Sequence, residues 1–433
     1  MRLDISFKDK DAIQSVGAAF LPKSVLIPLE QESGVLCAPL IKEGDRIFEG
    51  QVIAEDSAGT DSAKIHSSIP GIAQKITNCS ASDGRSKPAV QIKLAGSFSH
   101  IGKIGRSFDW KSWGSSSILN RISALGVVNT FDMRAPRSLS SDIKAVKDNP
   151  DLRFFVRLFD EDPICQTDLT LARTQFDKIL TGIEILKEIM QPKEIVFACA
   201  KNDAKIQSSL FPLTSDEKNI IMPMDLKNYP AAKKASLCAK FIKQTKCAES
   251  DRSIIENSLF IDANSLVLFS DAIVYNVPVE RVYVHVFGDC LKSSAVLKVC
   301  IGESVHNLAL QLGLSPKKIG KVIVNGYLRG RAIPSLDTPI SKNVKSVAFI
   351  SRKDMADYSS AICVGCGSCR ASCPAKIYPD VIFSHAVRSV KTPQIFVRSS
   401  LLCIECGVCD SVCPTKLPLS EIVKISKEKQ NAK

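Results

Sequence analysis

The chain has 433 residues, more than a single hydrophobic core usually serves, so we expect two to four domains. Hydrophobic residues make up 45% and charged residues 24%, which excludes a disordered chain, a collagen-like repeat and a disulfide-held miniprotein. The formal net charge is +12, and residues 341–433 contribute +7 of it, from 14 Lys and Arg against 7 Asp and Glu. Sixteen cysteines are unusual beside 5 His and 2 Trp, and half of them lie in the last 71 residues.

The first residues and the most apolar segment bear on where the chain is made. Residues 1–9 carry charged side chains too often to form the apolar core of a signal peptide. Residues 266–287 are interrupted by Asp271 and Glu280, short of the roughly 18 uninterrupted apolar residues of a membrane-spanning helix. We therefore expect a cytoplasmic protein, in whose reducing environment clustered cysteines are metal ligands rather than disulfides.

Short strands separated by turns characterise the N-terminal part, residues 1–97. The turn dipeptides Gly44-Asp45 and Pro70-Gly71 separate apolar runs, and the pattern resembles the lipoyl or biotinyl barrel-sandwich fold. Carrier versions of that fold attach their group to a lysine at a hairpin tip. That position falls near Thr60 here, so a structural or docking role is favoured over a swinging arm.

Two further domains are expected before the cysteine-rich end, after a Gly-, Ser- and Lys-rich linker at residues 98–115. Over residues 116–276, apolar strands such as 194–200 alternate with helical patterns such as 176–190. This alternation predicts a Rossmann-like α/β domain with a parallel sheet. Residues 280–352 open with alternating valines and continue through a helix to another strand, which predicts a β-grasp unit.

Two segments of the C-terminal part, residues 355–433, have the same cysteine spacing. Residues 363–374 (CVGCGSCRASCP) and 403–414 (CIECGVCDSVCP) both read C-x2-C-x2-C-x3-C-P, the bacterial run that binds [4Fe–4S] clusters. In two-cluster ferredoxins the fourth cysteine of each run ligates the other cluster. The expected ligand sets are Cys363, Cys366, Cys369 and Cys413 for one cluster, and Cys403, Cys406, Cys409 and Cys373 for the second.

Helical patterns at residues 380–388 and 419–427 indicate a helical two-cluster ferredoxin domain rather than a minimal βαβ one. The alternative is a pair of zinc sites, but these usually use two C-x2-4-C pairs separated by a longer loop. Eight cysteines form no pair at metal spacing and are expected to be small buried hydrophobes: Cys37, Cys79, Cys165, Cys199, Cys238, Cys247, Cys290 and Cys300.

The assembled order predicts a multidomain chain of mixed α+β and α/β class, and it resembles the RnfC family, the C subunit of the Rnf ion-translocating electron-transport complex. The resemblance covers nearly the whole chain. It implies a peripheral subunit on the cytoplasmic face of the inner membrane, with the other Rnf subunits as partners. It also implies an α/β domain similar to the flavoprotein subunit of NADH dehydrogenase, which holds FMN and NADH. The motifs that carry the resemblance are Gly44-Asp45, Gly50-Gln51, His66-Ser67-Ser68, residues 335–342 and both cysteine runs.

The segments that correspond to the family's flavin site depart from its pattern. The glycine-rich flavin loop corresponds to residues 124–132, where Gly126 remains but valines replace other glycines and Asp132 replaces a proline. Residues 157–164 keep the acidic side chains Asp160 and Glu161 without the family's Asn and Gly, and residues 211–218 also lack their glycine. Lost glycines remove backbone N–H groups that would cradle a phosphate.

Two explanations remain open for this site. Either the flavin and NADH site is lost and another carrier supplies the electrons, or FMN is retained through altered contacts; the missing glycines favour loss. Asp160 and Asp162 are then more simply read as helix caps or solvated side chains.

The leading hypothesis is a peripheral electron-transfer subunit of an Rnf-type membrane complex, which relays electrons through two [4Fe–4S] clusters and is coupled to ion translocation. Whether the chain is itself an enzyme stays open, and no catalytic residue is assigned. An acidic ferredoxin or flavodoxin is a further expected partner, because residues 341–433 are basic. The alternative is a flavin-dependent NADH oxidoreductase subunit. Nucleic acid is not an expected partner, since basic runs with interleaved aromatics are missing and aromatics make up only 6%.

Overall fold

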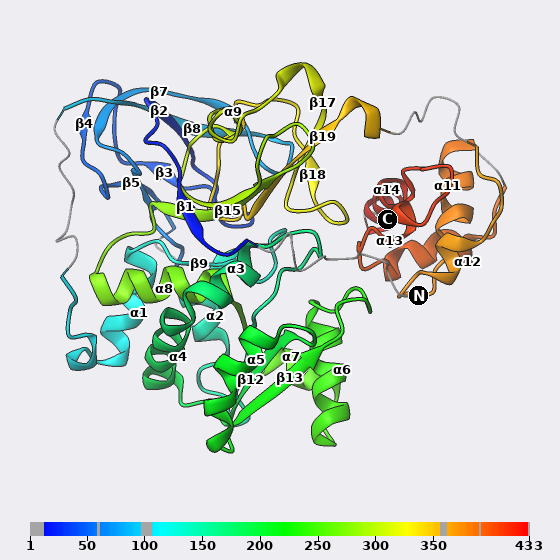
Figure 1. The fold of residues 1–433 in the computed structure, drawn as a ribbon, viewed down its shortest axis with the longest axis horizontal. Helices are drawn as coiled ribbons and strands as arrows, with labels where there is room; N and C mark the ends of the chain where they lie inside the picture. The colour runs from blue at the N-terminus through cyan, green and yellow to red at the C-terminus, as the bar shows by residue number, and fades with distance from the viewer. Residues whose placement is uncertain (1–12, 59–60, 97–105, 356–361, 389–390, 432–433) are drawn as a thin grey trace.

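The computed structural model describes residues 13–58, 61–96, 106–355, 362–388 and 391–431. Figure 1 shows two groups of strands lying side by side, an α/β part packed against them, and a helical module at one end of the molecule. Thr60 and residues 1–9, on which two of the expectations above rest, lie outside the described residues.

The N-terminal strands form two small antiparallel sheets. The larger has the order β2-β8-β7-β4, and the smaller has the order β3-β5-β6. Ile27, Ile53 and Ile92 are fully buried in one apolar cluster, so the two sheets share one core. The strand bounds are β2 (Ser24–Pro28), β3 (Ala38–Pro39), β4 (Arg46–Ile47), β5 (Val52–Glu55), β6 (Ile65–His66), β7 (Gly71–Ser80) and β8 (Ser86–Leu94).

The first described strand, β1 (Val16–Ala18), lies outside these two sheets. It pairs in parallel with β16 (Ala295–Cys300), with Val16 opposite Val296. Residues 16–18 therefore belong structurally to the third sheet, although the sequence placed all of residues 1–97 in one N-terminal domain. The pairing has a physical reason, because β1 covers N–H and C=O groups that β16 would otherwise expose at a sheet edge.

The expected parallel sheet is present in the α/β part, where four strands pair in the order β13-β12-β11-β14. All four carboxyl ends meet at one edge, which is where α/β proteins usually bind ligands. The strands are β11 (Arg153–Arg157), β12 (Glu194–Ala200), β13 (Asn219–Met224) and β14 (Ser258–Asp262), with a hairpin of β9 (Val128–Asn129) and β10 (Arg137–Ser138). The helices are α1 (Ser115–Ala124), α2 (Leu139–Val146), α3 (Thr167–Thr174), α4 (Phe176–Met190), α5 (Ala204–Leu210), α6 (Lys234–Thr245), α7 (Asp251–Glu256) and α8 (Ala263–Tyr275).

The segment expected to be a linker, residues 98–115, is in part structured. Trp110 is buried in a 3-10 turn, and the Phe108 N–H donates to the carbonyl of Val274 at the end of α8 over 2.7 Å. Its described residues, 106–115, therefore pack onto the α/β part. Single 3-10 turns lie at Trp110–Ser112, Phe211–Ser215, Pro316–Lys318, Arg352–Asp354 and Ser399–Leu402.

The third part is a six-stranded mixed sheet with the order β1-β16-β15-β19-β17-β18. Its central strands β15 and β19 are parallel, and β15 and β16 are antiparallel neighbours. The remaining elements are β15 (Arg281–Phe287), α9 (Val305–Gln311), β17 (Ile319–Val324), β18 (Arg331–Ala332) and β19 (Ser346–Ser351).

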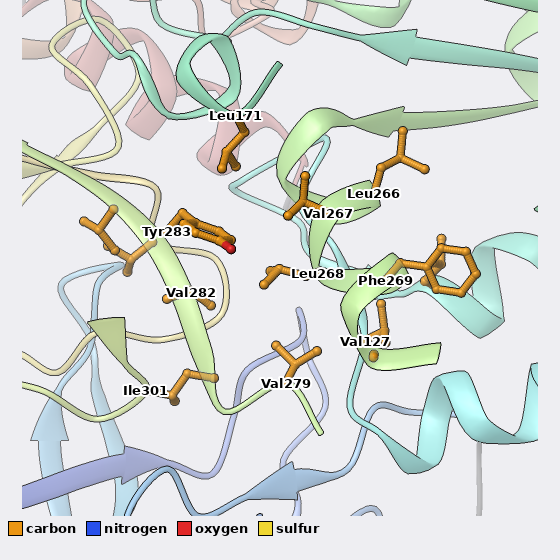
Figure 2. Close-up of a cluster of buried hydrophobic side chains, with 14 of the residues drawn as sticks. Val127, Leu171, Leu266, Val267, Leu268, Phe269, Val279, Val282, Tyr283 and Ile301 are labelled. Carbon is orange, nitrogen blue, oxygen red and sulfur yellow. The ribbon is translucent and has the colours of Figure 1, made fainter. Parts of the chain in front are cut away.

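A continuous apolar cluster joins the α/β part to this third sheet. Figure 2 shows α8 side chains such as Leu268 facing Val282 and Tyr283 of β15, with Leu171 of α3 beside them. The most apolar stretch of the chain is thus a buried helix followed by a buried strand. Among the described residues no helix is both long enough and apolar enough to cross a bilayer.

The C-terminal module is helical in its described ranges, 362–388 and 391–431, as its sequence predicts. The expected helices at residues 380–388 and 419–427 correspond to α11 (Pro379–Arg388) and α14 (Leu419–Asn431), which pack on one another. The shorter helices are α10 (Ser368–Ala371), α12 (Gln394–Arg398) and α13 (Val408–Ser411).

The burial of His285 in β15 predicts a pH dependence of stability. Burial lowers the pKa of His285 from 6.5 to about 3, so the unfolded chain binds a proton below pH 6.5 that the folded chain excludes. Its contribution to stability is therefore complete above pH 6.5 and falls with pH, by about 2 kcal/mol between pH 7 and pH 5. Urea denaturation at both pH values should show a smaller decline for His285→Phe than for the wild type. An identical decline in both proteins would contradict the buried neutral imidazole.

Candidate metal centre

The two cysteine runs have the same backbone conformation, forty residues apart. Three positions of each run have a positive φ, which leaves the backbone curled around the thiols. Two of them flank the second cysteine of the run, and the third follows the Cys-Pro pair. The matched positions are Gly365 (69°) and Glu405 (54°), Gly367 (73°) and Gly407 (77°), and Lys376 (52°) and Lys416 (55°).

The fourth cysteine of the first run lies with the thiols of the second run. Cys373 and Cys403 pack against the same apolar cluster. Burial raises the pKa of Cys409, and the charge of Asp410 and then those of Cys406, Cys403 and Cys373 raise it further. Burial likewise raises the pKa of Cys406, with Cys373 and Cys403 adding to it. Cys373 is therefore brought together with three cysteines that follow it by at least thirty residues.

The third cysteine of the first run lies with the fourth cysteine of the second run. Cys369 and Cys413 are buried in one apolar cluster with Phe383 and Leu417, and Cys363 packs against it. Cys409 packs against this cluster too, which shows how close the two sets of thiols lie. Cys373 and Cys403 instead pack against Ile377, Ile382 and Val423.

The residues present fit iron–sulfur clusters by their donor chemistry. The thiols accept backbone hydrogen bonds, from Glu405 N–H to Cys403 Sγ and from Leu417 N–H to Cys413 Sγ, each 3.4 Å long. Such bonds to sulfur are among the contacts that set cluster potentials. No three His, Cys, Asp or Glu side chains of the described residues close around a single metal ion. Around a cube of four irons each cysteine binds a different iron, which requires a wider arrangement.

The second cysteine run packs directly on the rest of the molecule. A Cβ added to Gly407 would lie 1.9 Å from the carbonyl oxygen of Leu328, so only glycine allows this approach. The Tyr229 hydroxyl donates to the carbonyl of Cys406 over 3.0 Å. The helical module is thus attached to the α/β part through Tyr229 and to the third sheet through the β17–β18 loop.

Cations surround this attachment. Arg134 pairs with Glu405 over 2.7 Å, and Arg329 donates to the Glu405 carbonyl over 3.3 Å. From the other side, Lys427 of α14 donates to the Cys403 carbonyl over 2.7 Å. Sequence reasoning missed Arg134, Arg329 and Tyr229. Only their place in loops after strands could have pointed to them.

The three residues predicted to remain from a flavin site, Gly126, Asp160 and Glu161, have structural roles. Gly126 (φ 73°) lies at a turn after α1, where a Cβ would be 2.5 Å from the Lys64 carbonyl oxygen. Asp160 accepts hydrogen bonds from the N–H groups of Thr167, Asp168 and Leu169, which makes it the cap of α3. This is the helix-cap role that the sequence offered as the simpler interpretation of Asp160.

Glu161 and Asp162 are also engaged by the third sheet. Glu161 is ion-paired with Arg329, and Lys233 lies 3.3 Å away. Asp162 accepts the N–H of Leu328 over 2.7 Å. The acidic run therefore anchors the β17–β18 loop, which in turn contacts Gly407.

Four fully buried charged side chains fill the carboxyl edge of the parallel sheet. Lys345, just before β19, donates to Asp168 over 2.8 Å and also to Asp262. Arg157, at the end of β11, lies 3.6 Å from Asp262, and its guanidinium lies over the ring of Phe131, 4.1 Å from the centroid. Burial alone would raise the pKa of Asp262, but Lys345 and Arg157 hold it below its usual value.

Two of the helices that start at this edge, α3 and α8, already have an anionic cap. Asp160 takes the first N–H groups of α3, while Asp262 accepts from Ser265 over 2.8 Å and Asp168 accepts from Asn264 over 3.0 Å in α8. These N–H groups are the usual donors to a nucleotide phosphate in α/β proteins. At α3 and α8 they are therefore not available, and these two helix ends do not fit a phosphate of FMN.

The other residues singled out by the sequence lie elsewhere. Residues 211–215 form a surface turn in which Phe211 is 75% exposed. Of the eight cysteines outside the runs all but Cys247, which is half-buried, are buried, as expected for small hydrophobes.

Family models match a segment near each end of the chain. Residues 6–97 match the family model of the RnfC barrel sandwich hybrid domain, and residues 362–417 match that of the 4Fe-4S dicluster domain. Proteins named as the C subunits of ion-translocating oxidoreductase complexes match over most of the chain. The chain resembles the RnfC family.

These RnfC relatives are distant in sequence. The C subunit of the ion-translocating oxidoreductase complex of Vibrio cholerae is 23% identical over 86% of this chain, which spans about half (48%) of its length. The C subunit of the proton-translocating ferredoxin:NAD(+) oxidoreductase complex of Clostridium ljungdahlii is 22% identical, over 87% of this chain and 81% of its own. Its counterpart in the Na(+)-translocating ferredoxin:NAD(+) oxidoreductase complex of Acetobacterium woodii is 22% identical, over 88% and 86%.

A solved structure shares the fold. A chain of an NAD+-reducing [NiFe]-hydrogenase in the H2-reduced state superimposes with a TM-score of 0.50 at 12% identity. The likeness covers 77% of this chain and 68% of that one, and it concerns the fold alone.

Alanine substitutions of two glycines at matched positions test the attachment of the second run to the rest of the molecule. Gly407→Ala should lose about 2 kcal/mol more stability than Gly367→Ala, because both incur the same positive-φ strain but only the methyl group added at position 407 would overpack a neighbour. Hydrogen exchange should show faster exchange at residues 326–330 in Gly407→Ala alone. Equal effects of the two substitutions would contradict the contact with Leu328.

Removing the buried cation tests the network at the sheet edge. Lys345→Met leaves Asp168 and Asp262 facing only Arg157, so the α/β part should lose about 3–5 kcal/mol. The chain's two tryptophans, Trp110 and Trp113, both lie just before α1, so their fluorescence in urea reports on this part. Adding Asp168→Asn should recover some of the loss. A midpoint unchanged by Lys345→Met would contradict the pairing.

Proposed function

We propose that this chain is a peripheral electron-transfer subunit of an Rnf-type membrane complex and holds two [4Fe–4S] clusters. The observation that carries the proposal is the repeated C-x2-C-x2-C-x3-C-P run, with three matched positive-φ positions in each copy. The match to the 4Fe-4S dicluster family over residues 362–417 supports it. When bound, each cluster would accept and release one electron.

We further propose that the runs exchange their fourth cysteines. The first ligand set is Cys363, Cys366, Cys369 and Cys413; the second is Cys403, Cys406, Cys409 and Cys373. The packing of Cys373 and Cys403 against one apolar cluster supports the second set. Cys369 and Cys413 are buried in another apolar cluster, against which Cys363 and Cys409 both pack, and this supports the first.

The domain plan is part of the proposal. Residues 1–97 would form the barrel-sandwich domain apart from β1, residues 116–276 a Rossmann-like domain, residues 280–352 a β-grasp unit and residues 355–433 the cluster domain. Support comes from the all-parallel sheet of the second and from the parallel pair β15 and β19 inside the mixed sheet of the third.

Loss of the flavin and NADH site also belongs to the proposal. The support is that Arg157, Lys345 and their carboxylate partners fill the sheet edge, and that carboxylates cap α3 and α8 where phosphate would bind. Electrons would then arrive from another protein rather than from NADH. The partners that follow are the other subunits of the complex, which would hold this chain at the cytoplasmic face of the membrane and couple it to ion translocation.

Metal and flavin content test the function. Purified without oxygen, the chain should contain about eight irons and no extractable flavin, and NADH should not reduce it. An FMN that NADH reduces would overturn the proposed loss and favour the flavin-dependent oxidoreductase instead. Zinc in place of iron would overturn the proposal as a whole.

Single cysteine variants test the exchanged ligands by electron paramagnetic resonance. Cys373→Ala should perturb the same cluster signal as Cys403→Ala, and Cys413→Ala the same signal as Cys363→Ala. If Cys373→Ala instead matched Cys363→Ala, each run would close its own cluster. Wild-type spectra recorded after dithionite reduction are the reference for both pairs.

A further inference from the structure

A cavity of about 480 Å³ lies where three parts of the molecule meet. Its lining residues come from the N-terminal strands (within 28–34 and 81–87), from the loop before α2 (within 133–136) and from the third sheet (within 324–331 and 341–343). None of the described lining residues belongs to 124–132 or 157–164, the segments that correspond to the family's flavin site. No cysteine lines the cavity either, so it is distinct from both sites discussed so far.

Contacts between the three parts hold the walls of this cavity together. The tip of the β7–β8 hairpin reaches β18, where a Cβ added to Gly84 would lie 3.8 Å from the Ala332 carbonyl oxygen. Ser82 Oγ of the same hairpin donates to Asn343 Oδ1 over 3.4 Å, and the Asn343 amide donates to the Met133 carbonyl over 3.2 Å. The cavity is thus a product of the assembled fold.

The cations that line the cavity are of two kinds. Lys87, Arg134 and Arg329 already pair with carboxylates of the chain. Arg85, at the hairpin tip, and Arg331, in β18, have no ion pair among the described residues. Each is the chain neighbour of a residue in the contact between hairpin and strand, so both guanidiniums can reach one oxyanion. Their two positive charges match a phosphate monoester, which carries about −1.5 to −2 at pH 7.

One further carboxylate of the lining is engaged from within the protein. Glu32 is buried and accepts from the N–H groups of Ala63 and Ser138. Burial raises the pKa of Glu32, and the positive charge of the fully buried Lys342 opposes that rise. The two arginines of the hairpin and β18 are therefore left for a ligand.

The rest of the lining suits hydroxyl groups better than a flat ring. Serine hydroxyls and asparagine amides are part of it, and none of the described lining residues is aromatic. Gln31 also lines the cavity and is 5% exposed, and its Oε1 has no hydrogen-bond partner among the described residues. A flavin or a nucleotide base would find no aromatic side chain to stack on. The lining therefore favours a small hydroxylated molecule.

We propose that this cavity binds a small hydroxylated phosphate ester of the sugar-phosphate class, with its phosphate held between Arg85 and Arg331. The planar fork of a guanidinium fits phosphate oxygens, and such charge-assisted hydrogen bonds are stronger than neutral ones. The hydroxyl groups of the ligand face the serine and asparagine side chains of the lining. Binding joins the β7–β8 hairpin to β18 through the ligand. The site goes beyond the proposed function, because it does not need the clusters.

Calorimetry with ribose 5-phosphate tests the site on the full chain with its clusters. The wild type should bind one molecule per chain. Arg85→Gln and Arg331→Gln should each weaken binding by about tenfold or more, because each removes a charge-assisted contact with the phosphate. The matched control is Arg46→Gln, an exposed arginine in β4, which lies far from β18 (Figure 1). This control should stay within about twofold of the wild type.

A thermal melt gives a second, independent measurement. Ribose 5-phosphate should raise the midpoint of the wild type and leave that of the double variant Arg85→Gln/Arg331→Gln unchanged, because only a ligand that binds the folded chain stabilises it. Arg85 is exposed and Arg331 half-buried, so both substitutions leave the core intact.

No binding by the wild type, or equal binding by Arg331→Gln and Arg46→Gln, would overturn the sugar-phosphate site. Tighter binding of citrate or of FMN than of ribose 5-phosphate would overturn it too, because a polycarboxylate or a flavin would then be the better ligand. Iron content measured on the same samples separates this proposal from the proposed function. A chain without iron that still binds ribose 5-phosphate would contradict the proposed function alone.

Discussion

The buried network of Lys345, Arg157, Asp168 and Asp262 is the interaction on which the arrangement of the molecule depends. Charges without water must neutralise one another, so strands β11 and β14, helix α3 and the third sheet are held in a single relative position. The apolar cluster between α8 and β15 reinforces that position. Removing either the cations or the carboxylates would leave buried charge without a counter-charge. The arrangement therefore requires both.

The same network changes the chemistry of the sheet edge. In α/β proteins this edge is normally kept open for a ligand, with helix N–H groups facing it. Here carboxylates of the protein accept from those N–H groups, and an arginine lies over an aromatic ring of the loop that resembles a flavin loop. The departures in the sequence thus coincide with carboxylates of the chain that accept from the first N–H groups of α3 and α8.

How far the sequence predicts this molecule depends on the range of each interaction. The cysteine runs, helix α14 and strand β12 follow from local spacing and periodicity, which need no knowledge of distant residues. The pairing of Val16 with Val296 joins residues more than half the length of the chain apart, and three residues of β1 carry no distinctive pattern. Lys345 and Arg329 are single cations in ordinary loops, and only the assembled fold shows that they meet Asp168 and Glu161.

The burial of the cysteines outside the runs has a consequence for how clusters are assembled. Seven of the eight cysteines outside the runs are buried, whereas Cys366 is exposed and Cys363, Cys373, Cys403 and Cys409 are only partly buried. Iron, sulfide or an oxidant that reaches the folded chain from solution would therefore meet thiols of the C-terminal module before the others.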